Sequence, residues 1–178
     1  MSENAAGKSP GKITVREIAV LGLLLGLMEA GKRMLDFLPN VEVITLLFIV
    51  YAIWLGKKAY ILAVAFTMLE TMVWGVHNWV IMYLYMWPLL ITVVRLRKRH
   101  GEVTHGFCCV LAGVFGLFFG ALCSIPYWFI GGPSMAFTWW VAGIPYDIIH
   151  CVSNFLICLV LFKPVNSLMA RAHSQGYF

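Results

Sequence analysis

Charged residues are scarce in this chain of 178 residues. Asp, Glu, Lys and Arg together make up 12% of it, whereas 61% of the residues are hydrophobic and 15% are aromatic. Soluble domains carry about 25% charged and roughly 45–50% apolar residues, so this composition excludes an ordinary water-soluble protein. We therefore expect an all-α membrane protein.

The common catalytic motifs are missing as well. The sequence has no G-x-x-x-x-G-K-[ST] loop, so it does not predict ATP binding in the P-loop manner. It also lacks H-E-x-x-H and C-x-x-C, which excludes the commonest metal-dependent enzymes. The five cysteines lie within apolar runs without metal-ligand spacing. We expect no enzyme, no cofactor of its own and no metal site.

Apolar stretches between helix breakers predict a compact bundle of six transmembrane helices, at about 20 residues per crossing. The predicted helices are 14–35, 42–55, 59–75, 79–96, 104–125 and 139–162. Residues 126–137, with Gly131-Gly132-Pro133, are predicted to form a non-helical loop, and Pro164 is predicted to end the last helix. Residues 13–170 would form the transmembrane domain, between a disordered cytoplasmic tail (1–12) and a short cytoplasmic tail (171–178).

The positive charges predict the orientation of this bundle. If the N-terminus is cytoplasmic, only Lys32 and Arg33 of the 13 Lys and Arg residues lie outside, as the positive-inside rule requires. The inner set is Lys8, Lys12, Arg16, Lys57, Lys58, Arg95, Arg97, Lys98, Arg99, Lys163 and Arg171. Both termini are then cytoplasmic. The RLRKR run is interpreted as a topology signal and not as a nucleic-acid site, because no aromatic stacking pattern surrounds it.

Acidic and aromatic residues gather at the opposite, outer side. The acids there are Glu29, Asp36, Glu42, Glu70 and Asp147. Flat apolar walls with a few fixed polar groups are what a bound organic molecule needs. In the outer loops and adjoining helices, the candidate ligand-binding residues are Asn40, Glu42, Trp74, His77, Tyr85, Tyr127, Trp128, Trp139 and Trp140.

The last predicted helix adds four more candidates, Tyr146, Asp147, His150 and Asn154. Asp147, His150 and Asn154 recur at spacings of three and four, which places them on one helical face. An aspartate in an apolar helix is costly and should face a cavity or a polar partner. A ligand-facing role, a structural contact with His150 and a proton relay are all open interpretations of Asp147.

Small residues at spacings of four occur in two predicted helices. Ala112, Gly116 and Gly120 are expected to pack inside the bundle, because such spacing lets helix backbones approach closely. Gly22 and Gly26 in the first helix fit either internal packing or a docking surface for another membrane protein.

Several segments together resemble the substrate-binding S components of energy-coupling factor (ECF) transporters. The segments are IAVLGLLLGLMEA, LPNVEVITLLFIVYAIWLG, GIPYDIIHCVSNF and the FKP that follows, and the resemblance runs from Thr14 to about Met169. It implies a bacterial plasma-membrane protein that captures a vitamin at the outer face. Delivery would occur by toppling in the bilayer, together with a transmembrane coupling subunit and two cytoplasmic ATPases that use the ATP. Gly22 and Gly26 would meet the coupling subunit.

The resemblance is greatest to cobalamin-specific members, so cobalamin or another corrinoid is the expected substrate. Pantothenate, a folate, riboflavin or a queuosine precursor fits the same aromatic and polar residues. A structural six-helix membrane scaffold is an alternative. So is an intramembrane enzyme that uses Asp147 and His150 as an acid–base pair, although no nucleophile or metal site is spaced to complete it.

Overall fold

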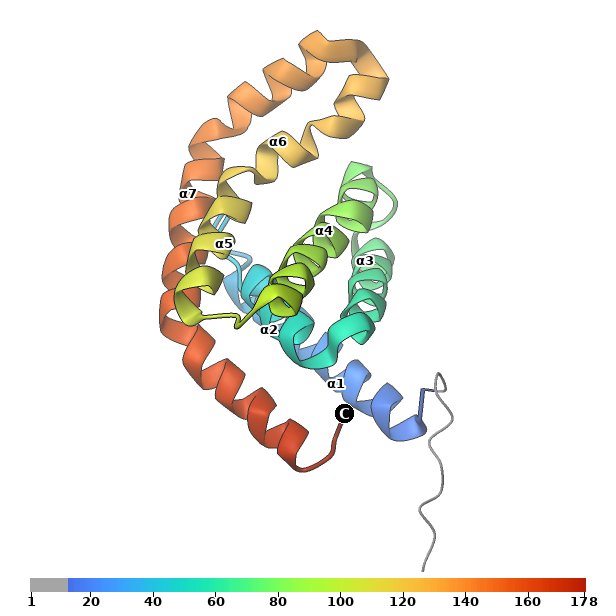
Figure 1. The fold of residues 1–178 in the computed structure, drawn as a ribbon. Coiled ribbons are helices and arrows are strands. Elements are labelled where there is room, and N and C mark those ends of the chain that lie inside the picture. Colours follow the sequence, from blue (N-terminus) through green and yellow to red (C-terminus); the bar gives the residue numbers. More distant parts are fainter. Residues whose placement is uncertain (1–12) are drawn as a thin grey trace, which may run out of the picture.

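The computed structural model describes residues 13–178, and this part of the chain is helical without β-strands. The elements are α1 (Val15–Leu35), α2 (Ile44–Leu55), the 3-10 helix η1 (Gly56–Lys58), α3 (Ala59–Trp74), α4 (Asn78–His100), α5 (His105–Leu117), α6 (Phe119–Cys123) and α7 (Ile125–Ser174) (Figure 1). The predicted all-α class is confirmed. The predicted N-terminal tail, 1–12, lies outside the described residues.

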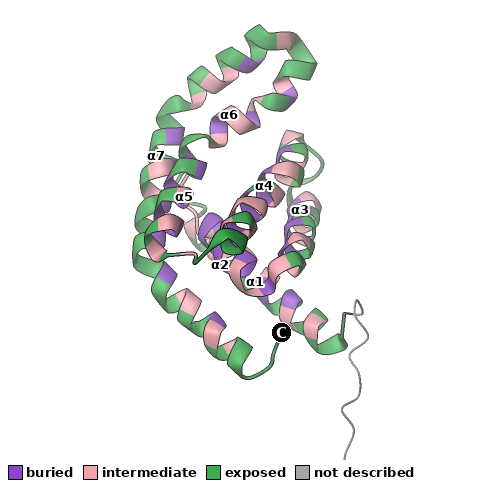
Figure 2. Cartoon of the chain, in the orientation of Figure 1, coloured by how far each residue is buried: buried purple, intermediate pink, exposed green. Residues whose placement is uncertain are grey.

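The core of the molecule is built around α2. Nine of its 12 residues are buried, because α4 and α7 both pack against it and α1, α3 and α5 add further contacts. Buried residues gather where these helices meet, whereas the outer faces of α3 and α7 are mostly exposed (Figure 2). A helix that is apolar all round is suited to a protein core or to a membrane, and α2 occupies the core.

Three helical stretches are long and apolar enough to cross a membrane: Ile44–Trp74, Asn78–His100 and Ile125–Ser174. Large apolar side chains such as Met68, Leu84 and Val160 are exposed on them, as expected of surfaces that face lipid. With 12 and 13 residues, α2 and α5 are about 18 and 20 Å long, against a hydrocarbon core of about 30 Å. Six spans with cytoplasmic termini stay a prediction.

Helix α1 is anchored at its N-terminal end. Thr14 and Glu17 form a capping box: the Glu17 N–H donates to Thr14 Oγ1 at 3.2 Å and the Thr14 N–H donates to Glu17 Oε2 at 3.0 Å. The Lys58 ammonium lies 2.7 Å from Glu17 Oε1. The start of α1 is thereby attached to the turn between α2 and α3.

The prediction of a loop over 126–137 is wrong, because this segment is helical apart from Gly131 and Gly132. Pro126 lies in the first turn of α7, where a missing N–H costs nothing, and Pro133 directly follows the break. Gly132 has a φ of +78°, which only glycine adopts easily, and the helix changes direction there. In Figure 1, α6 and the start of α7 form an arm that extends beyond α3 and α4 and then turns back.

The predicted end of the last helix at Pro164 is also wrong, since α7 continues to Ser174. Proline removes one helical hydrogen bond, but side-chain contacts hold the segment that follows. Trp54 Nε1 donates to Asn166 Oδ1 at 2.8 Å, and Met169 is buried. These contacts with α2 hold the continued helix in place.

Glycines let α5 pack directly on the backbone of α7, as the small-residue spacing predicts. A Cβ at Gly116 would lie 2.7 Å from the carbonyl carbon and oxygen of His150. A Cβ at Gly120 would overlap the Asp147 carboxylate. Gly106, near the start of α5, faces no described atom within 4 Å. The closest approach therefore lies beside His150 and Asp147, and the start of α5 at Gly106 has no such contact.

We expect Gly116→Ala to lower the unfolding free energy by about 1–3 kcal/mol, because the added methyl group meets backbone that cannot move aside. Thermal unfolding in detergent micelles measures this loss. Gly106→Ala is the matched control in the same helix and should unfold at or slightly above the wild-type temperature, since alanine favours helix. Equal melting temperatures for the two variants would contradict the backbone contact.

Candidate functional site

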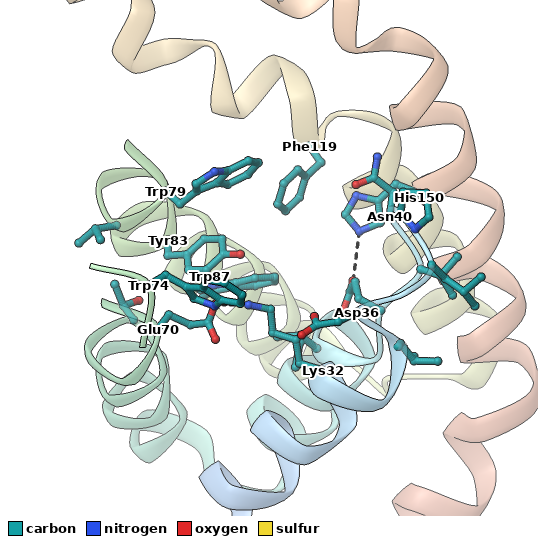
Figure 3. Close-up of a pocket in the computed structure, with 18 of the residues that line it drawn as sticks. Lys32, Asp36, Asn40, Glu70, Trp74, Trp79, Tyr83, Trp87, Phe119 and His150 are labelled. Atoms are coloured by element: carbon teal, nitrogen blue, oxygen red, sulfur yellow. Dashed lines mark hydrogen bonds and ion pairs between the residues drawn. The ribbon is translucent and has the colours of Figure 1, made fainter. Parts of the chain in front are cut away.

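A cavity of about 460 Å³ opens at the end of the bundle where the α1–α2 connection, the end of α3 and the start of α4 meet. Phe119 of α6 and His150 of α7 complete its wall (Figure 3). Its lining residues are Lys32, Leu35, Asp36, Leu38, Pro39, Asn40, Val41, Glu42, Ile44, Thr67, Glu70, Trp74, His77, Trp79, Val80, Tyr83, Trp87, Phe119 and His150. This volume is within the range of small-molecule sites, about 300–1,000 Å³.

One wall of the cavity is an aromatic face of α4. Trp79, Tyr83 and Trp87 follow one another at spacings of four, so successive helical turns bring their rings together. The ring centroids of Tyr83 and Trp87 lie 5.4 Å apart, and those of Trp79 and Tyr83 lie 6.2 Å apart. His77 caps the start of α4, since its Nδ1 accepts from the Trp79 N–H at 3.2 Å. The cap and the spacing together position the wall.

Trp87 forms the deepest part of this wall. Its ring stacks on Phe48 of α2 with centroids 4.9 Å apart, and only 3% of the residue is exposed. Its indole Nε1 is buried and has no hydrogen-bond partner among the described residues. Buried indole N–H groups usually find a partner. The deepest residue of the wall therefore carries a hydrogen-bond donor that the described residues leave unpaired.

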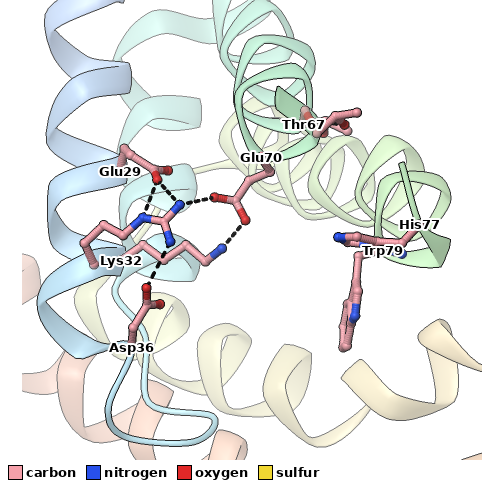
Figure 4. A network of polar contacts seen from close by, with 9 residues as sticks. Glu29, Lys32, Asp36, Thr67, Glu70, His77 and Trp79 are labelled. Atoms are coloured by element: carbon pink, nitrogen blue, oxygen red, sulfur yellow. Dashed lines mark hydrogen bonds and ion pairs between the residues drawn. The ribbon is translucent and has the colours of Figure 1, made fainter. Parts of the chain in front are cut away.

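Opposite α4, charged groups from α1 and α3 form a network. The Lys32 ammonium is paired with Glu70 Oε2, and Arg33 lies between Glu29 at 2.5 Å, Asp36 at 3.2 Å and Glu70 at 3.7 Å (Figure 4). Glu70 Oε1 is buried and accepts no hydrogen bond within residues 13–178. Isolated buried charges are costly, so these groups stabilise one another. The network holds the end of α1 against α3.

The α1–α2 connection is attached to α7 by a second polar cluster. Glu42 Oε1 lies 3.2 Å from His150 Nε2, and Glu42 Oε2 accepts from the Thr45 N–H at 2.8 Å. Asn154 Nδ2 donates to Thr45 Oγ1 at 3.2 Å. Burial opposes ionisation of Glu42, but its contacts with His150 and Thr45 outweigh that effect and hold the pKa of Glu42 below its ordinary value.

Asn40 gives this connection its shape. It has a φ of +57°, in the left-handed region that asparagine tolerates better than most residues. Its carbonyl oxygen accepts from Ser153 Oγ of α7 at 2.8 Å. The turn therefore lies against α7 and closes one side of the cavity.

Five of the sequence-predicted site residues line the cavity: Asn40, Glu42, Trp74, His77 and His150. Asp147 and Asn154 lie on the same buried face of α7 as His150, with 5% and 2% exposed, as their spacing predicts. Asp147 Oδ1 accepts from the Gly120 N–H at 2.8 Å, so its carboxylate caps the break between α5 and α6. Asp147 and His150 thus have separate partners.

The other predicted site residues lie outside the lining of this cavity. Tyr85 donates to the Leu122 carbonyl oxygen at 2.6 Å. Tyr127 stacks on Trp139 with centroids 4.9 Å apart, and Trp139 lines a shallow hollow on the arm. Trp128 and Tyr146 are more than half exposed, and Trp140 packs edge-on against Phe137. Their predicted role in ligand binding remains a prediction.

Several lining residues were not predicted as binding residues from the sequence. Trp79, Tyr83 and Trp87 carry a detectable signal, since three aromatic residues at spacings of four mark one helical face. Lys32 and Glu70 carry none, because their pairing joins positions 38 residues apart. Phe119 contacts His150, with ring centroids 4.7 Å apart, because of the break after α5.

Comparisons with known proteins add no relative: no family model, curated protein or solved structure matches the chain. Within residues 13–178 there is no group of three or more His, Cys, Asp or Glu side chains placed to hold a metal ion. The function of the cavity is therefore inferred from its lining, which has aromatic rings of α4 on one side and paired charges of α1 and α3 on the other.

We expect acidification to destabilise the wild type more than Glu42→Gln. Because the pKa of Glu42 in the folded protein lies below its ordinary value of 4.5, its carboxylate stabilises the fold above that pH. This contribution is lost as the pH falls through the lowered pKa. Unfolding temperatures at several pH values in detergent measure it. Glu102→Gln, at an exposed acid between α4 and α5, should follow the wild type, whereas parallel curves for wild type and Glu42→Gln would contradict the prediction.

Proposed function

We propose that this protein is the membrane-embedded substrate-binding subunit of an ECF-type vitamin transporter in a bacterial plasma membrane. It captures a vitamin in the cavity beside α4 and delivers it inward by toppling, while partner ATPases supply the energy through a transmembrane coupling subunit. The observation that carries this proposal is the cavity of about 460 Å³ with an aromatic wall and fixed polar groups.

The position of the cavity supports this proposal. It is formed at the end of the bundle that contains Lys32 and Arg33, which the distribution of positive charge assigns to the outer side. A cavity at that end is accessible from outside the cell. The aromatic rings supply apolar contact area, and the polar groups around them can orient a ligand.

The size of the cavity bears on the choice of vitamin. A volume of about 460 Å³ lies in the lower half of the range for small-molecule sites, about 300–1,000 Å³. Cobalamin is the expected substrate on resemblance, and it is among the largest vitamins. The volume favours a smaller vitamin with a flat ring, such as riboflavin or a queuosine precursor.

The exposed face of α1 supports docking of a coupling subunit. No described atom lies within 4 Å of a Cβ placed at Gly22 or Gly26. Leu23 and Leu27, beside these glycines, are 65% and 53% exposed. An exposed helix face of glycines flanked by leucines permits close approach of another apolar helix.

Purified protein is expected to bind a vitamin without ATP, because its site is complete without a nucleotide. Calorimetry in detergent with cobalamin, riboflavin, folate, pantothenate, thiamin and a queuosine precursor tests this. Uptake of the bound vitamin by cells should require co-expression of the coupling subunit and the ATPases. Binding of none of these compounds would overturn the proposal.

Trp79→Ala should weaken vitamin binding about tenfold or more, since it removes one ring of the wall and about 1.4 kcal/mol or more of binding free energy. Trp128→Ala is the matched control, because Trp128 is similarly exposed but lies outside the cavity lining. Calorimetric affinities measure both effects. A larger loss for Trp128→Ala would place the ligand on the arm instead.

Gly22→Leu combined with Gly26→Leu is expected to abolish uptake while leaving vitamin affinity unchanged, because these glycines lie outside the cavity lining. Radiolabelled uptake and calorimetry separate the two effects. Gly106→Leu, at another position without a described neighbour, is the control and should transport normally. Normal uptake by the double variant would contradict docking at this face.

A further inference from the structure

Some polar atoms of the residues that line the cavity have hydrogen-bond or ion-pair partners within the described chain, and others have no hydrogen-bond partner there. Glu42 is held by His150 and Thr45, and Asp36 is held by Arg33. Two buried atoms of lining residues have no hydrogen-bond partner within residues 13–178, Trp87 Nε1 and Glu70 Oε1, although Glu70 Oε1 lies 3.7 Å from Arg33 Nη2. One is a donor and the other an acceptor, and both residues line the cavity.

Such atoms indicate a missing partner. An unpaired buried polar group costs about 1–3 kcal/mol, so few remain in folded proteins unless water or a ligand satisfies them. Trp87 is 3% exposed and Glu70 is 6% exposed, so bulk water does not reach either freely. Both atoms have almost no accessible surface, so a ligand in the cavity would complete their hydrogen bonds once the neighbouring side chains shift.

The charge of the lining indicates the charge of that ligand. Three carboxylates, Asp36, Glu42 and Glu70, line the cavity with one lysine, Lys32. Behind them Arg33 lies between Glu29, Asp36 and Glu70, and in the sum of charges it offsets Glu29. The lining therefore carries two more negative than positive charges when His150 is neutral, and one more when it is protonated.

The aromatic wall also favours a positively charged ligand. The faces of Trp and Tyr rings attract cations, and Trp74, Trp79 and Tyr83 all line the cavity. Arg33 already lies over the Trp74 ring, 4.9 Å from its centroid. A flat positive ring between these aromatic residues and the carboxylates would be attracted from both sides.

We propose that the ligand is a flat heteroaromatic cation with a ring hydrogen-bond acceptor, and that Glu70 and Trp87 select it. This inference rests on the proposed function, since it assigns a substrate class to the same cavity. Glu70 faces the positive edge of the ligand, and the Trp87 indole N–H donates to its ring acceptor. Carboxylate-bearing vitamins such as pantothenate and folate are repelled.

A panel of vitamins of different charge tests this inference on the full chain in detergent. The probes are thiamin, which is a heteroaromatic cation with ring acceptors, neutral riboflavin and cobalamin, and anionic folate and pantothenate. Thiamin diphosphate carries the same rings as thiamin with negative charge. Thiamin should bind about tenfold or more tightly than every anion and more tightly than the neutral probes. Tightest binding of a neutral or anionic probe overturns the inference but leaves the proposed function standing, whereas no binding at all overturns both.

Two variants test the residues. Glu70→Gln keeps the side-chain shape and removes the charge, so it should weaken thiamin about tenfold without weakening riboflavin. Trp87→Phe removes the N–H and keeps a ring, so it should weaken thiamin. Glu102→Gln and Trp128→Phe are the matched controls outside the cavity lining. If Glu70→Gln does not fold, Asp36→Asn replaces it at a more exposed carboxylate of the same lining. Thiamin affinities that equal those of the controls overturn the assignment.

Discussion

The contact between Glu42 and His150 joins two segments that are far apart in the sequence, and it does so at the candidate site. These residues are 108 positions apart, and their contact holds the α1–α2 connection against α7. Thr45 and Asn154 extend the same attachment by one further hydrogen bond, and Ser153 holds the backbone at Asn40. In an apolar surrounding these bonds are stronger than in water, because the competing solvent is absent. The α1–α2 connection held in this way forms one side of the cavity, and the aromatic face of α4 forms another.

The helical class follows from composition and from the position of breakers. A continuous apolar chain must satisfy its backbone groups internally, and helices do this within one segment. Proline and glycine in the region after α5 predict helix breaks, and that prediction is wrong for most of the segment. Pro126 and Pro133 lie where a missing N–H is harmless, and only Gly131 and Gly132 interrupt the helix. Proline disfavours the interior of a helix, but in the first helical turn it removes no hydrogen bond and costs little free energy.

The sequence predicts those residues of the candidate site that lie on one face of one helix, because their spacing of three or four is visible in it. The spacing of Asp147, His150 and Asn154 predicts their common buried face on α7, and the spacing of Trp79, Tyr83 and Trp87 carries a similar signal for α4. The pairing of Lys32 with Glu70 brings together α1 and α3 and depends on how the helices are arranged. Trp128 and Trp140, which were also predicted to bind ligand, lie on the arm and outside the lining of this cavity, and their role stays a prediction. Residue type alone does not distinguish these two groups.

The length of α7 has a mechanical consequence. From position 133 to Ser174 it is a bent rod of about 60 Å, and His150 lies partway along it with its backbone against Gly116. Gly116 of α5 holds this helix beside the cavity, and Trp54 of α2 holds it again at Asn166. Because both contacts lie on one continuous helix, a displacement along its axis at one contact requires a displacement at the other or a bend between them.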